Sequence, residues 1–296
     1  MQIGFIGLGR MGSNMVLNLL DHEIKVAAYN RSPKPIEEIA KKGAIPAYTI
    51  MELASKLPKR KIVWIMVTSS SVDYILEDLL PLLNKGDIII DGGNSFYKDS
   101  IRRHNKLRSR GIYFLDVGTS GGVEGARHGA CLMVGGETEA FREAEYIFKA
   151  LAKKDGYKYV GQSGSGHFVK MVHNGIEYGM MAAISEGFEA IYKHKKDFSL
   201  DLKTIAEVYS NGSIISSSLI NWLKNVLNKD PELSSIKGTV PLGETEKEMN
   251  YLKGISEMPV LSQAIKEREK SRKKQNFRSK VVAALRNEFG EHKLIE

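Results

Sequence analysis

Apolar and polar positions follow two different rhythms along this chain of 296 residues. In the first part, short apolar runs alternate with segments in which apolar residues recur every three or four positions, a pattern typical of strands alternating with helices. The pattern predicts strands at residues 2–6, 25–29, 61–67, 87–91, 113–117 and 130–134, and its clearest helices at 11–20, 72–83 and 98–109. This alternation indicates an α/β domain with a Rossmann-type, right-handed, doubly wound parallel sheet.

The rhythm changes after residue 160, where the segment GQSGSGHFVKMVHNGIEYGMMAAISEGFEAIYKH has helical periodicity and no strand signal. Ser163 and Ser165, which lie among glycines, are the expected N-caps of a long helix. The remaining residues predict shorter helices, interrupted at Asp230-Pro231, around Gly238 and Pro241, and at Met258-Pro259. We therefore expect the sheet to occupy residues 1–163 and an all-helical C-terminal domain to occupy residues 164–296.

Three glycines follow the first expected strand in the pattern GxGxxG. Gly7 permits a tight turn, Gly9 lets a pyrophosphate approach the backbone, and Gly12 lets the next helix pack closely on the strand. The pattern alone also fits a simple glycine-rich turn, but its place between a strand and a helix N-terminus predicts dinucleotide binding. The predicted cofactor site contains Gly7, Leu8, Gly9, Arg10, Met11, Gly12, Asn30, Arg31, Ser32, Val67 and Asn94.

The end of the second expected strand bears on which dinucleotide is bound. NAD-specific folds usually place an acidic residue there for the ribose, whereas this chain has Asn30, Arg31 and Ser32. Arg31 and Ser32 favour the 2′-phosphate of NADP. An arginine that stacks on the adenine would suit NAD as well, so NADP is preferred and NAD stays possible.

The long helix carries the residue types needed for proton transfer. One face, within an arc of roughly 140°, holds Lys170, His173, Asn174, Glu177 and Tyr178. The opposite face is apolar and holds Val169, Val172, Ile176, Met180 and Ala183. Any surface helix shows two such faces, but a lysine and a carboxylate on one of them supply a base and an acid if that face meets a cofactor.

Two glycine-rich loops follow expected strands, Asp91-Gly92-Gly93-Asn94-Ser95 and Gly118-Thr119-Ser120-Gly121-Gly122. Ligands of open parallel sheets bind beyond the carboxyl ends of the strands, where Asn94, Ser120 and backbone amides can hold a carboxylate and hydroxyls. Each loop taken alone would equally suit a tight connection.

Together, several segments resemble the signatures of 6-phosphogluconate dehydrogenase, in particular its short form. They are GLGRMGSN, DGGNSFYKDS, DVGTSGGVEGARHGACLMVGG, GSGHFVKMVHNGIEYGMM and ALRNEFGEH. The resemblance implies oxidative decarboxylation of 6-phosphogluconate to ribulose 5-phosphate and CO2, a reaction that needs no metal. It also implies a role in gluconate utilisation and the pentose phosphate pathway. By matching motif, Lys170 would be the base and Glu177 the acid. Substrate contacts would come from Asn94, Ser120, Gly121, Gly122, His173, Asn174, Tyr178, Arg268, Arg286 and His292.

The resemblance also implies a homodimer or homotetramer in which the C-terminal tail, with Arg286 and His292, reaches a neighbouring subunit. Arg286 by itself would also be a favourable charge near a helix C-terminus. One segment departs from the family pattern. The family usually has Gly-Lys-Trp after the loop near Gly238, with its lysine at the phosphate, whereas this chain reads GTVPLGETEKEMNYL, so that Lys247 is the candidate replacement.

Composition and charge narrow the remaining alternatives. The chain begins with an apolar strand rather than a secretory signal and has no apolar run of membrane-spanning length, so we expect a cytoplasmic protein without membrane contact. Its one cysteine, Cys131, is expected to be a buried small hydrophobe. The net charge of +8 is concentrated in residues 266–280, which contain one aromatic residue and no stacking motif, so nucleic-acid binding is not expected.

Two other functions remain as alternatives to the family reaction. One is a dehydrogenase of a different hydroxy acid, since the altered segment can reshape the far end of the pocket. The other is a dinucleotide-binding protein without catalysis, against which the presence of Lys170, Asn174 and Glu177 argues.

Overall fold

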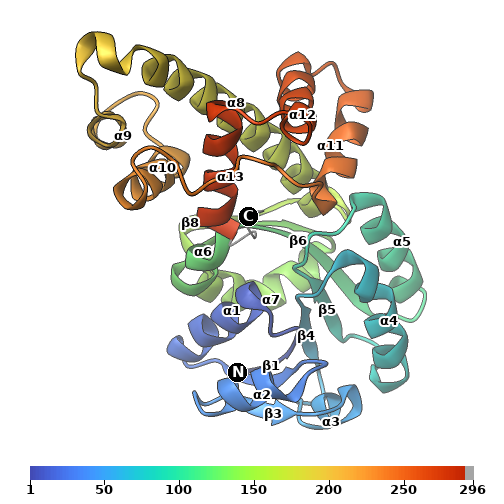
Figure 1. Cartoon of the computed structure of the whole chain (residues 1–296). Helices are drawn as coiled ribbons and strands as arrows, with labels where there is room; N and C mark the ends of the chain where they lie inside the picture. Colours follow the sequence, from blue (N-terminus) through green and yellow to red (C-terminus); the bar gives the residue numbers. More distant parts are fainter. Residues whose placement is uncertain (291–296) are drawn as a thin grey trace. The chain divides into compact units, whose positions relative to one another are not determined.

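The computed structural model describes residues 1–290 (Figure 1). The chain divides into two compact units, Met1–Lys170 and Met171–Glu296. Helix α8 (Ser165–Phe198) begins in the first unit and continues into the second.

The first unit contains an eight-stranded sheet with the order β3-β2-β1-β4-β5-β6-β7-β8. Its strands are β1 (Gln2–Ile6), β2 (Lys25–Tyr29), β3 (Ile45–Ala47), β4 (Ile62–Ile65), β5 (Ile88–Asp91), β6 (Tyr113–Ser120), β7 (Ala130–Gly135) and β8 (Ala152–Gly161). Every neighbouring pair is parallel except β6 and β7, which are antiparallel. The Rossmann-type fold and all six expected strands are confirmed, with one antiparallel pair added.

Two strands that we did not predict form the edges of the sheet. β3 is only three residues long and contains a proline. β8 has a mostly exposed or half-buried sequence, AKKDGYKYVG, without an apolar alternation. Edge strands have one unpaired side and little buried surface, so their sequences carry a weak strand pattern.

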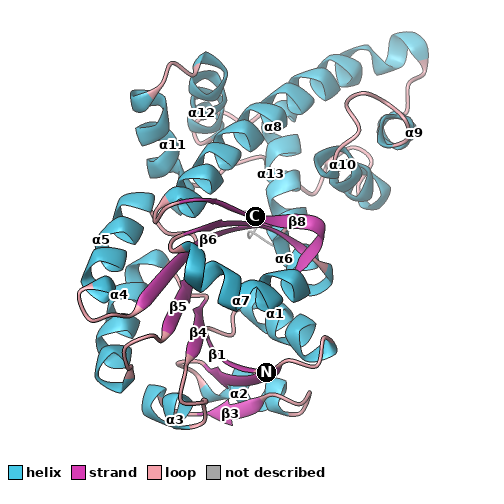
Figure 2. Cartoon of the chain, turned by 180° about the vertical axis from the view of Figure 1, so that it is seen from behind, coloured by secondary structure: helices cyan, strands magenta, loops and turns pink. Residues whose placement is uncertain are grey.

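Helices cover both faces of this sheet (Figure 2). They are α1 (Arg10–Asp21), α2 (Pro33–Ala40), α3 (Ile50–Ser55), α4 (Ser69–Leu79), α5 (Tyr97–Arg108), α6 (Gly122–His128) and α7 (Thr138–Leu151), with a short 3-10 turn η1 (Leu80–Leu82). Helices α1, α2 and α7 pack with Phe5 and Trp64 on one face, and α3, α4 and α5 pack with Ile6 and Ile65 on the other. Successive strand residues thus enter opposite cores, and each buried side chain of this size contributes about 1.5–3 kcal/mol to stability.

The second unit is helical, as expected. Its helices after α8 are α9 (Leu202–Ser210), α10 (Ser218–Lys229), α11 (Glu244–Ile255), α12 (Pro259–Ser271) and α13 (Phe277–Gly290). Asp201 and Ser217 cap α9 and α10 by accepting hydrogen bonds from the amides of Thr204 and Ile220. Apolar side chains of α8, α9, α10 and α13 form its core.

The start of α8 differs from the expected one. The hydroxyls of Ser163 and Ser165 are buried and form no hydrogen bond with the described residues, so the predicted N-caps are wrong. The Asp116 carboxylate on β6 serves instead, because it accepts hydrogen bonds from the amides of Gly164 (2.7 Å) and His167 (2.9 Å). A carboxylate from another element satisfies the free amides of the first turn as a local cap would.

Glycines let this first turn lie directly against the sheet. A side chain at Gly166 would collide with the carbonyls of Asp116 and Met133, and one at Gly135 would meet the amide of Gly166 at 2.7 Å. The close approach therefore depends on residues of both β6 and β7 that leave room for the helix backbone.

The substitution Gly166→Ala tests this packing. Because the backbone of β6 blocks the added methyl group, we expect the free energy of unfolding to fall by about 1–3 kcal/mol or more, measured by chemical denaturation. Gly187→Ala is the matched control on the same helix, where an added Cβ has no neighbour within 4 Å. We expect the control to be neutral or to stabilise by up to about 1 kcal/mol; equal effects of the two changes would contradict the packing.

Candidate active site

The turn between β1 and α1 has the geometry of a dinucleotide-binding loop. Gly7 has a φ of 102°, and a side chain there would collide with the carbonyl of Met66 at the end of β4. A side chain at Gly12 would collide with the carbonyl of Gly7, whereas at Gly9 it would have no neighbour within 4 Å. No side chain caps α1 at Gly9. The first and third glycines are thus required by packing, and the second leaves open space beside the amides of a helix N-terminus.

The predicted residues after β2 have separate roles in the structure. The Asn30 side chain accepts a hydrogen bond from the Leu8 amide at 3.0 Å and thereby supports the glycine turn. Arg31 and Ser32 are exposed, and no carboxylate of residues 1–290 forms an ion pair with Arg31. The arginine is therefore available to an anionic ligand.

The two glycine-rich loops lie together at the carboxyl ends of β4, β5 and β6. The Thr119 hydroxyl donates a hydrogen bond to the carbonyl of Gly92 at 3.2 Å. A Cβ at Gly93 would approach the carbonyl of Val67 to 2.7 Å, so the loop that carries Asn94 also touches the end of the β4 segment. The predicted cofactor and substrate residues Val67, Asn94 and Ser120 thus belong to adjoining loops of the first unit.

Lys170 joins the same group of residues. A Cβ at Gly118 would lie only 2.7 Å from the carbonyl of Gly166 and would also collide with the Cβ of Lys170. The stem of the lysine therefore packs directly on the strand that ends at Ser120. The contacts that place the start of α8 also place Lys170, because this residue lies within the first two turns of the helix.

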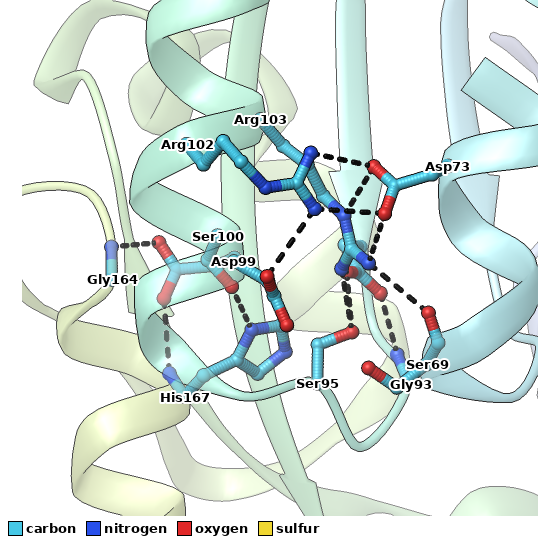
Figure 3. A network of polar contacts seen from close by, with 12 residues as sticks. Ser69, Asp73, Gly93, Ser95, Asp99, Ser100, Arg102, Arg103, Gly164 and His167 are labelled. Atoms are coloured by element: carbon cyan, nitrogen blue, oxygen red, sulfur yellow. Dashed lines mark hydrogen bonds and ion pairs between the residues drawn. The ribbon is translucent and has the colours of Figure 1, made fainter. Parts of the chain in front are cut away.

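A buried arginine supports the loop that carries Asn94 (Figure 3). Arg103 on α5 is 1% exposed and donates to the Asp91 carboxylate (3.2 Å), the Ser95 hydroxyl (3.1 Å) and the Ser69 carbonyl (3.0 Å). It also bonds to Asp73, whose pKa is held well below its usual range by Arg102 and Arg103. One guanidinium thus ties the loop after β5 to the start of α4.

The polar face of α8 is its more buried face. Asn174 and Tyr178 are 6% and 7% exposed, whereas Ile176 and Met180 on the apolar face are 57% and 42% exposed. His173 and Glu177 are half-buried, and Nδ1 of the imidazole lies 3.9 Å from a carboxylate oxygen of Glu177. An ordinary surface helix buries its apolar face and exposes its polar face. The reverse distribution on α8 indicates that its polar side chains serve to contact other groups of the protein or a ligand.

The second unit contains two buried cations near the end of this polar face. Arg268 and Arg286 are 5% and 8% exposed. The Arg268 guanidinium lies over the Tyr178 ring, 3.4 Å from its centroid, and burial lowers the pKa of this group to about 10. Burial also lowers the pKa of Arg286, whose side chain donates to the Pro241 carbonyl at 3.2 Å. Both side chains remain charged at neutral pH.

Comparison with known proteins agrees with this arrangement. Residues 2–164 match the family model described as the NAD binding domain of 6-phosphogluconate dehydrogenase, and residues 166–196 match the C-terminal domain of that enzyme. The chain is 45% identical over 294 residues to a Bacillus subtilis protein provisionally named 6-phosphogluconate dehydrogenase, covering 99% of this chain and 98% of that one. The chain belongs to the 6-phosphogluconate dehydrogenase family.

Two further relatives are informative. A Haloferax volcanii enzyme named NAD(+)-dependent, decarboxylating 6-phosphogluconate dehydrogenase is 38% identical, with 99% of this chain and 98% of that protein covered. The solved 6-phosphogluconate dehydrogenase of Plasmodium falciparum, studied with NADP+ and with 6-phosphogluconate, is 33% identical with a TM-score of 0.82. That comparison covers 92% of this chain but only 62% of the Plasmodium chain. The protein is therefore a dinucleotide-binding oxidoreductase of the 6-phosphogluconate dehydrogenase family.

The structure also describes most of the other residues that were singled out from the sequence. Lys247 is exposed on α11, and His292 lies outside the described residues. Cys131 is exposed, not buried, because on β7 it faces away from its buried neighbours Ala130 and Leu132. Gly121 and Gly122 follow Ser120 with positive φ values of 129° and 63°. Within residues 1–290, no group of acidic, histidine or cysteine side chains has the arrangement of a metal site, and no helix could cross a bilayer.

Sequence reasoning missed the residues that support the family's functional loops. Asp116 and Arg103 lie in segments that were assigned only as strand and helix. The available signal was a charged residue within an otherwise apolar strand, as at Asp91 and Asp116, because such a residue requires a buried partner. The partner itself could not be identified without the fold.

Arg103→Met tests the supporting role of this arginine in the 6-phosphogluconate dehydrogenase fold. The change leaves the Asp91 carboxylate, which is fully buried, without its cation. We expect the free energy of unfolding to fall by about 3–5 kcal/mol. Arg102→Met is the matched control, since Arg102 is half exposed and pairs with Asp73 and Asp99 at the surface. Its loss should cost less than about 1 kcal/mol, and similar melting curves for the two variants would contradict the assignment.

Proposed function

We propose that this protein catalyses the oxidative decarboxylation of 6-phosphogluconate to ribulose 5-phosphate and CO2, with hydride transfer to NADP. The observation that carries the proposal is the place of Lys170, whose stem packs on Gly118 beside the Asn94 and Ser120 loops. A base is thereby held next to groups that can bind a carboxylate and hydroxyls. The family relatives support the same reaction.

The residues of the first unit fit a nicotinamide dinucleotide. The open space at Gly9 beside the uncapped start of α1 suits a pyrophosphate, and Leu8, Arg10 and Met11 would flank it. The exposed Arg31 and Ser32 favour a 2′-phosphate, which supports NADP over NAD. When bound, the dinucleotide supplies the hydride acceptor.

Lys170 would act twice on the substrate. It would first take the proton of the C3 hydroxyl as the hydride leaves C3, giving a β-keto acid. The resulting ammonium group would then stabilise the negative charge that grows on the C3 oxygen as the carboxylate leaves as CO2. A cation at this oxygen provides the electron sink that decarboxylation needs.

Glu177 would finish the reaction by protonating the enediol carbon. It lies two helical turns after Lys170 on the same polar face of α8. Asn174 and His173 lie between them and would bind substrate hydroxyls together with Asn94, Ser120, Gly121 and Gly122. Tyr178, Arg268 and Arg286 would bind the phosphate, since two buried guanidiniums favour a dianion.

We also propose that the protein forms a homodimer or a homotetramer. The exposed apolar face of α8 supports this, because Ile176 and Met180 lie beside the exposed Val260 of α12, which would be 3.0 Å from a Cβ at Gly179. Contiguous apolar residues of this kind mark association surfaces. Arg286 is packed within its own chain, so of the two tail residues only His292 would still have to come from a neighbouring subunit.

The proposed function predicts that the purified protein reduces NADP, and NAD less efficiently, in the presence of 6-phosphogluconate with equimolar CO2. Lys170→Ala should lower kcat by roughly a thousandfold, because a general base and the cation at the C3 oxygen are both lost. Cofactor reduction would be followed by absorbance at the nicotinamide band and CO2 by a coupled assay.

Lys196→Ala is the matched control, an exposed lysine on the same helix, and it should retain full activity. A folded protein that binds the dinucleotide but reduces neither cofactor with 6-phosphogluconate would refute the substrate. Reduction without CO2 would instead show that the protein oxidises 6-phosphogluconate without decarboxylating it.

A further inference from the structure

Helix α5, which begins just after the loop that carries Asn94, packs against the first turns of α8. The rings of Tyr97 and Phe168 contact edge to face, with their centroids 5.3 Å apart. A Cβ at Gly164 would lie 2.7 Å from the side chain of Ile101. Apolar contacts of this kind hold two helices together but are not directional. They therefore constrain a small rotation or slide of α8 less sharply than a hydrogen bond would.

One polar contact joins the same two helices. The Ser100 hydroxyl of α5 lies 2.7 Å from Nδ1 of His167 on α8, and the two residues are 0% and 2% exposed. Figure 3 shows this hydrogen bond beside the one that the His167 amide donates to the Asp116 carboxylate. The backbone of His167 is thus held by β6 and its side chain by α5. Because hydrogen bonds weaken steeply with angle and distance, this pair fixes α8 against α5.

The other ring nitrogen of His167 indicates that stability alone does not account for this residue. Nε2 is buried and has no hydrogen-bond partner among residues 1–290. A buried polar atom without a partner costs about 1–3 kcal/mol, whereas replacing both members of a buried hydrogen bond by apolar groups can be nearly neutral. The bond between Ser100 and His167 is therefore a costly way to join two helices, and what it adds over an apolar contact is directional precision.

Lys170 lies about one helical turn after His167, so a rotation or slide of the helix start would displace the lysine. We propose that His167 is a positioning residue for the base: through Ser100 it holds Lys170 in register with the loop that carries Asn94. The inference rests on the proposed function, because it concerns Lys170 as the base of that reaction. Arg103 completes the link, since it donates from α5 to the Ser95 hydroxyl of the same loop.

Two substitutions of equal shape at His167 test the inference. Leucine and asparagine both lack the ring and have the same branched outline, but only the asparagine amide can bond to the Ser100 hydroxyl. We expect His167→Leu to lower kcat for 6-phosphogluconate oxidation by about 10- to 100-fold, because a displaced base slows the chemical step. The KM values for 6-phosphogluconate and the dinucleotide should change by less than about threefold. His167→Asn should retain most of the activity.

Ser100→Ala removes the other half of the hydrogen bond and should lower kcat to the same extent. The double variant Ser100→Ala/His167→Leu should be no slower than either single variant, because all three lose one and the same contact. Ser185→Ala is the matched control. Ser185 is also buried, on α8, but its hydroxyl donates within its own helix to the Ala182 carbonyl at 2.7 Å. This control should keep the kcat of the unchanged protein.

Equal kcat values for His167→Leu and His167→Asn would overturn the inference. So would a loss in His167→Leu that matches the fraction of unfolded protein measured by circular dichroism, since the role would then be structural only.

If the unchanged protein does not oxidise 6-phosphogluconate, the proposed function fails, and hydrogen exchange of the Phe168 amide, which bonds to the Gly164 carbonyl, tests the contact by itself. Exchange roughly tenfold faster in His167→Leu than in His167→Asn supports the fixing of α8 by this side chain. Equal exchange rates in the two variants would overturn it.

Discussion

Two buried carboxylates, Asp91 and Asp116, lie opposite each other on neighbouring strands β5 and β6, and both are fully excluded from solvent. A buried carboxylate is tolerated only where a cation or hydrogen-bond donors compensate its charge, and the two aspartates have different partners. Asp91 is paired with Arg103 of α5, whereas Asp116 receives the amides at the start of α8. The first pair fixes the loop that carries Asn94, and the second fixes the helix that carries Lys170.

The proposed catalytic geometry follows from these contacts together with the glycines around them. Gly118, Gly135 and Gly166 leave no room for side chains, so the backbone of α8 meets β6 and β7 directly. Because Lys170 is only a few residues from the Asp116 contact, a shift of the helix start would move the proposed base away from the Ser120 loop. Catalysis is sensitive to displacements of this size.

The parallel sheet, its six inner strands and the glycine turn were predictable because apolar periodicity and GxGxxG are local signals. The edge strands β3 and β8 were not, because they bury little apolar surface. The cap of α8 was mispredicted at Ser163 and Ser165, since a cap from Asp116, about 50 residues earlier, has no local signature.

The contact between Asp116 and α8 can be measured directly by hydrogen exchange of the Gly164 and His167 amides in the unchanged protein and in Asp116→Asn. The asparagine keeps the shape but loses the charge and one acceptor. The account predicts that exchange of these two amides accelerates roughly tenfold or more, while amides in the core of β1 are unaffected. Unchanged protection of Gly164 and His167 would contradict the claim that this carboxylate fixes the start of the helix.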